Sequence, residues 1–137
     1  MNTKKILLIF LLVILAIVII IAAVYYLTEA KSGEKKLETV IIPTGGKFQT
    51  NLKDSKNIIL LNYQIEVQDD KKLLALIDER CTEVRSRVLD ILRDKTMEEV
   101  DGTQGKVNLE TEILQYYRSL FGREEIIDVF IDDLVVQ

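Results

Sequence analysis

The sequence IILLNYQIEV, residues 58–67, is the clearest strand signal in the chain. Large apolar side chains at every second position, from Ile59 to Val67, alternate with Asn62, Gln64 and Glu66. This period of two is typical of a strand that buries one face and leaves the other toward solvent. We therefore expect residues 58–67 to form a half-buried strand.

Weaker strand signals lie on both sides of this stretch. Residues 37–42 predict a first strand that ends at Pro43, and residues 44–46 (Thr-Gly-Gly) predict a turn. Residues 48–52 predict a second strand, which the polar residues 53–57 separate from the third. A closing strand is expected at 126–136, with one face formed by Ile127, Val129 and Ile131 and the other by Asp128, Phe130 and Asp132. The adjacent Asp132-Asp133 interrupts this alternation and indicates a bulge.

Two helices and a short helical turn are expected between the third and the closing strand. Asp69-Asp70 precedes apolar residues at three- and four-residue steps, which predict a capped helix of about 24 residues. Thr96 to Glu99 matches a capping box, which predicts the short helical turn. Residues 103–106 are expected to be a loop. Residues 109–121 predict the second helix, with Asn108 as its cap and Gly122 as its end. The apolar stripe of the first helix consists of Leu73, Ile77, Cys81, Val84, Val88, Ile91 and Leu92.

The order of these elements predicts an α+β domain. The order of three strands, two helices and a closing strand fits a largely antiparallel sheet with the helices on one face. Residues 28–137, 110 in number, are long enough for one domain of ordinary size and too short for two.

Residues 6–27 form an unbroken apolar run without glycine, proline or charge. As a helix this run spans about 33 Å, against about 30 Å for the hydrocarbon core of a bilayer. The run is longer than the apolar part of a secretory signal peptide, so we expect an uncleaved membrane anchor with its ends at Ile6 and Leu27. The lipid bilayer is therefore the first expected partner.

Four ranges follow from this anchor: a cytoplasmic stub at 1–5, a transmembrane helix at 6–27, a linker at 28–36 and an extracytoplasmic domain at 37–137. The count of Lys and Arg on the two sides of the run gives no clear orientation. The short polar N-terminus favours a cytoplasmic N-terminus, which puts the domain outside the cytoplasm.

Composition excludes several kinds of chemistry. The chain has no His and one Cys, so it has no Ser-His or Cys-His pair, and neither a disulfide within the chain nor a CxxC site. Residues 28–137 carry 16 Lys and Arg against 22 Asp and Glu, a net charge of −6, which argues against nucleic acid as a partner. We expect no catalytic residue, no cofactor, no metal and no small-molecule substrate.

Two acidic pairs and the cysteine need an explanation in this scheme. Asp69-Asp70 is expected to cap the helix that follows, and Cys81 is expected to lie in the core. The pair Asp132-Asp133 lacks a third nearby acid and is a weak metal signal. A carboxylate enzyme that uses either pair remains an alternative.

The layout of the whole chain resembles the FliL family of flagellar basal-body proteins. Residues 48–52 (FQTNL) and 62–67 (NYQIEV) resemble two of its strands, and residues 84–96 resemble its amphipathic helix, which ends in Lys-Thr. Gly105-Lys106, residues 112–114 (EIL) and residues 129–137 resemble its later motifs. The linker is shorter than in many members, and Phe130-Ile131-Asp132 replaces their Tyr-Phe-Thr.

The resemblance implies a non-enzymatic protein of the bacterial inner membrane at the flagellar basal body. It implies a periplasmic domain with a stomatin-like (SPFH) fold that forms a homo-oligomeric ring around the MotA/MotB stator. The implied role is support of torque, motility and the chemotactic control of rotation. The remaining alternative is an anchored periplasmic binding or scaffold module unrelated to the flagellum.

Phe130 and Tyr116 are the candidate interface residues. Phe130 lies on the polar face of the expected closing strand, and Tyr116 lies beside the apolar face of the second helix. Aromatic side chains are enriched in protein interfaces, although packing in the core is the competing explanation for both.

Overall fold

The computed structural model describes residues 2–31, 38–53 and 55–137. The chain divides into two units, residues 1–36 and 37–137. The first unit contains helix α1 (Thr3–Lys31). Among the described residues, α1 is the one helix that is long and apolar enough to cross a membrane. The mean hydropathy of its most apolar 18-residue stretch is 3.7.

The expected anchor ends, Ile6 and Leu27, both lie inside α1. The helix runs to Lys31, into the range expected to be a linker, because Glu, Ala and Lys at 29–31 are good helix formers. The rest of that range, and the expected first residue of the first strand, lie outside the described residues.

The second unit is an α+β domain, as the order of elements predicts. Its strands are β1 (Thr39–Pro43), β2 (Phe48–Asn51), β3 (Ile58–Gln68) and β4 (Ile126–Val136). Strand β3 is central: β1 and β2 pair, one after the other, with opposite halves of one of its edges, and β4 pairs with its other edge. All three pairings are antiparallel.

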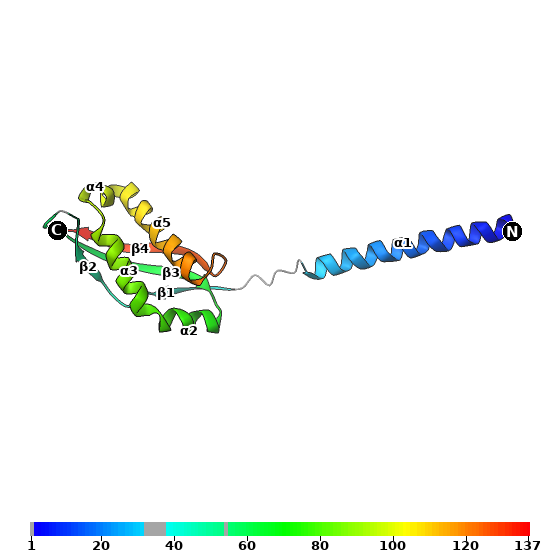
Figure 1. Cartoon of the computed structure of the whole chain (residues 1–137), viewed down its shortest axis with the longest axis horizontal. Coiled ribbons are helices and arrows are strands. Elements are labelled where there is room, and N and C mark those ends of the chain that lie inside the picture. The colour runs from blue at the N-terminus through cyan, green and yellow to red at the C-terminus, as the bar shows by residue number, and fades with distance from the viewer. Residues whose placement is uncertain (1, 32–37, 54) are drawn as a thin grey trace. The chain divides into compact units, whose positions relative to one another are not determined.

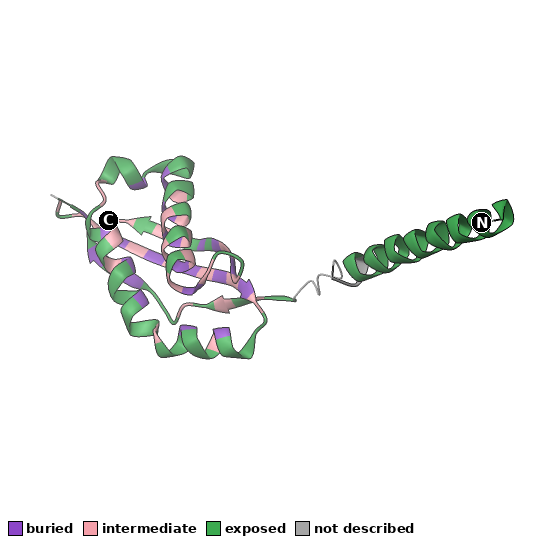
Figure 2. Cartoon of the chain, turned by 45° about the vertical axis from the view of Figure 1, so that its right-hand side comes forward, coloured by how far each residue is buried: buried purple, intermediate pink, exposed green. Residues whose placement is uncertain are grey.

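The predicted alternation of β3 is confirmed. Residues 59, 61, 63, 65 and 67 are each 1% exposed or less, whereas the residues between them are half-buried. Figure 1 shows α3 (Cys81–Arg93) and α5 (Gly102–Phe121) on one side of the sheet, and Figure 2 shows the buried residues along β3 and on the helices. Helix α5 packs over β4, and α3 packs over β2.

The closing strand contains the predicted bulge and a second one. Asn62 pairs with Asp133 and Tyr63 pairs with Ile131, so Asp132 is an extra residue in β4. Ile127 is extra in the same way, which makes the expected face of this strand partly wrong. The second bulge turns Ile126 into the core beside Val129 and Ile131, and Ile127 is only half-buried.

The expected single helix of about 24 residues is two helices. Helix α2 (Lys71–Glu79) and helix α3 meet at Arg80, whose backbone leaves the helical region at φ −96° and ψ 11°. The expected caps are present at the ends of this region. The side chain of Asp70 accepts a 2.8 Å bond from the Lys72 N–H, and Thr96 and Glu99 form the capping box of α4 (Met97–Val100).

Helix α5 begins seven residues earlier than expected: Asp101 takes the N-cap position, and residues 103–106 are helical. The expected loop and the Asn108 cap are therefore wrong. Gly105 continues the buried series Leu109, Ile113, Tyr117 and Phe121 at four-residue steps. A glycine serves here because a Cβ at this position would lie 2.7 Å from the Val100 carbonyl oxygen. Gly122, at φ +117°, ends the helix as predicted.

We expect Gly105→Ala to destabilise the domain although alanine is the better helix former. The added methyl group meets backbone atoms of Val100, which cannot rotate away, so we expect a loss of about 1–3 kcal/mol. Chemical denaturation of the full chain in detergent micelles, followed by circular dichroism, measures this loss. The control is Gln115→Ala, at an exposed position of the same helix. Equal stability of the two variants would contradict the close packing.

Candidate interaction surface

The helices leave the second face of the sheet open. Cross-strand rows on this face mix apolar and polar residues: Pro43, Gln64 and Phe130 form one row, and Ile41, Glu66 and Asp128 form the next. Ile41 is 53% exposed, Phe130 39% and Val135 37%. Exposed apolar side chains on one sheet face, bordered by carboxylates, are a pattern of protein-binding surfaces.

The structure gives the two candidate interface residues different surroundings. Phe130 is exposed on the open face of β4, opposite Gln64 of β3. Tyr116 is half-buried on α5, and its ring lies edge-on to Tyr117 at a centroid distance of 6.3 Å. Burial and the nearby Glu83 carboxylate raise the pKa of Tyr116. Phe130 is thus the more accessible of the two.

Side chains of α5 cover part of the outer edge of β4. The Arg118 guanidinium donates to the carbonyl oxygens of Ile126 (3.0 Å) and Ile127 (2.8 Å). The Glu110 carboxylate accepts a 2.9 Å bond from the Ile131 N–H. These bonds satisfy backbone groups of an edge strand, which within the described parts of the chain pairs with β3 alone.

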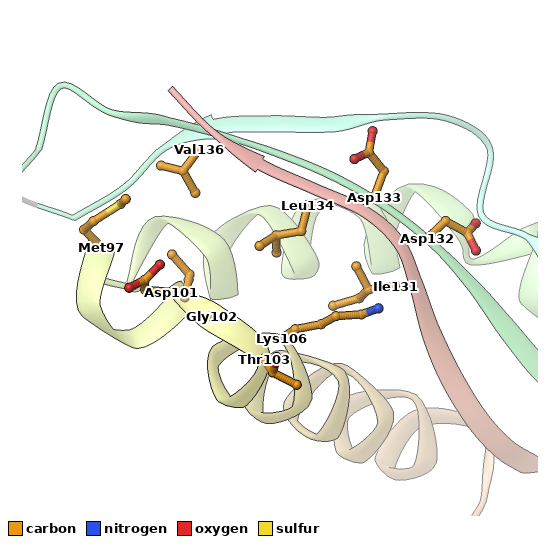
Figure 3. A pocket seen from close by; sticks show the side chains of 11 residues that line it. Met97, Asp101, Gly102, Thr103, Lys106, Ile131, Asp132, Asp133, Leu134 and Val136 are labelled. Carbon is orange, nitrogen blue, oxygen red and sulfur yellow. The ribbon is translucent and has the colours of Figure 1, made fainter.

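A groove of about 740 Å³ begins where this cover ends. One wall is the second half of β4, with Ile131, Leu134 and Val136, and the other is α4 with the first turns of α5. Figure 3 shows Leu134 and Val136 pointing toward the helices, whereas Asp133 points away from them. The charged residues at the groove are Asp101, Asp132, Asp133 and Lys106.

The carboxylates do not converge as an acid–base pair would. Asp101 lies near Met97 in Figure 3, at the other end of the view from Asp132. Asp133 pairs with Asn62, and Asp69 follows Gln68, so the two acidic pairs lie about 20 Å apart along β3. Among residues 2–31, 38–53 and 55–137, no three His, Cys, Asp or Glu side chains are grouped to hold a metal ion. This arrangement does not support the alternative of a carboxylate enzyme.

Cys81 is exposed, so its expected place in the core is wrong. The break at Arg80 changes the phase between α2 and α3, which leaves Ile77 and Val84 buried and turns Cys81 outward. Cys81 instead borders a second hollow, of about 560 Å³, between the α2–α3 junction and residues 42–48. The Arg85 guanidinium closes one side: it lies 4.5 Å from the centre of the Phe48 ring and donates to the Lys47 carbonyl oxygen at 2.9 Å.

Two buried tyrosines lie at the base of this hollow. The hydroxyl groups of Tyr63 and Tyr117 are 3.1 Å apart and form a hydrogen bond. Burial raises the pKa of Tyr117 to about 12, and burial together with the neighbouring Tyr117 raises the pKa of Tyr63 further. The shared bond satisfies two phenols that the core would otherwise leave unpaired.

The groove beside β4 was not predicted as a unit. Its residues come from positions 97–106 and 131–136, which are far apart in the sequence. The expected bulge at Asp132-Asp133 was the one local signal, because bulges are frequent at sheet edges and functional sites.

The comparison with protein families now gives this surface a context. The family model described as flagellar basal body-associated protein FliL matches residues 41–137, well over half of the chain. The chain belongs to the FliL family. The resemblance seen in the sequence is thereby confirmed, and the family associates this FliL protein with the flagellar basal body. Helix α1, which precedes the matched residues, is consistent with membrane anchoring. No curated protein matches the chain.

We expect the FliL domain to lose stability in alkali through its two buried tyrosines. A raised pKa means that folding stabilises the neutral phenol. This stability is complete below pH 10 and is lost as the pH rises from 10 toward 12. The loss for Tyr117 is about 3 kcal/mol, from about two pH units at about 1.4 kcal/mol each.

Denaturant unfolding of the full chain between pH 8 and about pH 11.5 measures this slope. We expect Tyr117→Phe to lower stability at pH 8 and to flatten the alkaline loss. The control is Tyr116→Phe, at the adjacent and less buried hydroxyl. A slope that Tyr117→Phe leaves unchanged would contradict the assignment.

Proposed function

We propose that this FliL protein is a membrane-anchored, non-enzymatic accessory of the flagellar motor that acts beside or around the MotA/MotB stator. The observation that carries the proposal is the family match over residues 41–137 behind an apolar helix of membrane-spanning length. In this role the protein supports torque, motility and the chemotactic control of rotation.

The proposed topology puts residues 1–5 in the cytoplasm, α1 across the inner membrane and residues 37–137 in the periplasm. The family match supports this orientation, because the FliL resemblance implies a periplasmic domain. The domain then lies on the same side of the membrane as the periplasmic parts of a stator.

We assign protein contact to the open face of the sheet. Phe130, Ile41 and Val135 expose apolar area there, and the surrounding carboxylates can distinguish between partners by charge. A ring of copies would need a second, different contact on each subunit, because a head-to-tail assembly joins unlike surfaces.

A deletion strain tests the role. We expect reduced swimming or fewer engaged stators, measured by tracking of single cells and by counting labelled MotB at motors. Normal swimming together with normal stator occupancy would refute the proposal. In-cell crosslinking of the domain, with identification of the captured proteins, tests the partner directly.

We expect Phe130→Glu to weaken the association with the motor while the domain stays folded. An exposed aromatic at the centre of an interface contributes about 2 kcal/mol or more to binding. The measurement is the crosslinking yield and the fraction of cells with labelled FliL at motors. The matched control is Val107→Glu, which charges an apolar residue of similar exposure (44% against 39%) on α5. Equal effects of the two variants would remove the assignment to the open sheet face.

A further inference from the structure

The second half of β4 directs backbone groups into the groove. Ile58 and Gln137 exchange both backbone hydrogen bonds, at 2.7 and 2.9 Å. In an antiparallel ladder bonded and non-bonded pairs alternate, so Val135 is bonded to Leu60, whereas Leu134 and Val136 belong to non-bonded pairs. The N–H and C=O groups of Leu134 and Val136 therefore point away from β3, toward the free edge.

These groups lie beyond the cover that α5 provides. Arg118 and Glu110 bond to the edge between Ile126 and Ile131 and to nothing further along it. Helix α5 begins at Gly102, beside this part of the strand, so it has no earlier turn that could supply another capping side chain. The uncovered length and the groove coincide: Leu134 and Val136 line both.

The groove has the features of a site for strand addition. An extended peptide bonds to an open strand edge through its backbone, and side-chain pockets select its sequence. Val100, Ile131 and Leu134 supply an apolar floor, and about 740 Å³ of space lies above it. Three acidic residues of this region, Asp101, Asp132 and Asp133, outnumber its single cation, Lys106, by two. The Asp133 carboxylate points away from the helices, so it would face an added strand from the open side of the sheet.

We propose that the β4 edge binds an extended, basic peptide segment of another protein as an added strand. Lys or Arg side chains of that segment would meet the acidic rim, and its apolar side chains would meet the floor. The inference rests on the geometry of this edge and is independent of the flagellar role.

Charge and strand length disfavour a second copy of this chain as the occupant. Pairing of two β4 edges would bring together two sets of Asp132 and Asp133, which repel each other. The opposite edge of the sheet consists of two short strands, β1 with 5 residues and β2 with 4, interrupted at 44–47. Neither offers a long continuous strand to the groove of a neighbour.

The test uses the full chain in detergent micelles and a short fluorescein-labelled peptide of alternating lysine and valine. We expect saturable binding by fluorescence anisotropy, and slower exchange of the Leu134 and Val136 amide hydrogens by NMR. The Val135 amide, which is already bonded to β3, serves as the internal reference. Two control peptides isolate the two parts of the proposal: one has glutamate in place of lysine, and one has N-methylated valines that cannot donate backbone bonds.

Variants of the protein provide an independent arm. We expect the triple variant Asp101→Asn, Asp132→Asn, Asp133→Asn to bind the lysine peptide at least about tenfold more weakly. Lys106→Gln removes the single cation of the groove and is expected to tighten binding, a gain that a damaged fold would not produce. The matched control removes three exposed acids outside the groove: Asp69→Asn, Glu79→Gln, Glu124→Gln.

Three results would overturn the proposal. The first is that the N-methylated peptide binds as tightly as the unmodified one, which would mean charge attraction without an added strand. The second is that peptide binding leaves the exchange of the Leu134 and Val136 amides unchanged. The third is that these amides are already protected without peptide, to an extent that rises with protein concentration, which would assign the edge to a second copy of the chain. The first two tests use the unmodified protein, so they do not depend on the folding of any variant.

Discussion

The pairing of β3 on both edges, with one face buried, constrains every other element of the domain. Because side chains alternate along a strand, a slip by one residue would move Asn62, Gln64 and Glu66 into the core. The apolar face of β3 fixes which side of the sheet the helices cover. The two bulges of β4 keep its apolar residues on the buried face. Ile127 and Asp132 are the extra residues of these bulges. As a result, Ile126, Val129 and Ile131 all face the core.

Helix α5 has two tasks that set the limits of the accessible surface. It contributes a buried series at four-residue steps to the core, and its Arg118 and Glu110 side chains satisfy the edge of β4. The Arg118 and Glu110 side chains bond only to the first half of β4. The second half lies opposite the first turns of α5, which supply no such bond, and the groove lies there. The open face with Phe130 and the groove thus both follow from how the helices are distributed over the sheet.

The sequence predicted what periodicity determines and missed what depends on contacts between distant residues. The alternation of residues 58–67, the Asp70 cap, the capping box at Thr96 and the bulge at Asp132 are local patterns, and the structure confirms them. The break at Arg80 has neither glycine nor proline to mark it, so Cys81 was assigned to a stripe that it leaves. Residues 103–106 were expected to be a loop, but they are helical, and a glycine fits at position 105 because a side chain there would collide with Val100. Which part of β4 is free could not be predicted, because that depends on the partners of Arg118 and Glu110.

The division of one sheet edge into β1 and β2 makes the two edges of the sheet differ in their ability to pair with a further strand. Pro43 and the interruption at 44–47 make that edge a poor template, since proline lacks a backbone donor and the two strands are short. Long, regular edges on both sides of a sheet allow strands to stack without end, as in amyloid fibrils. In a domain with one split edge and one partly covered edge, strand addition would stop after a single strand. Such a domain would join another protein in this way without starting polymers of its own.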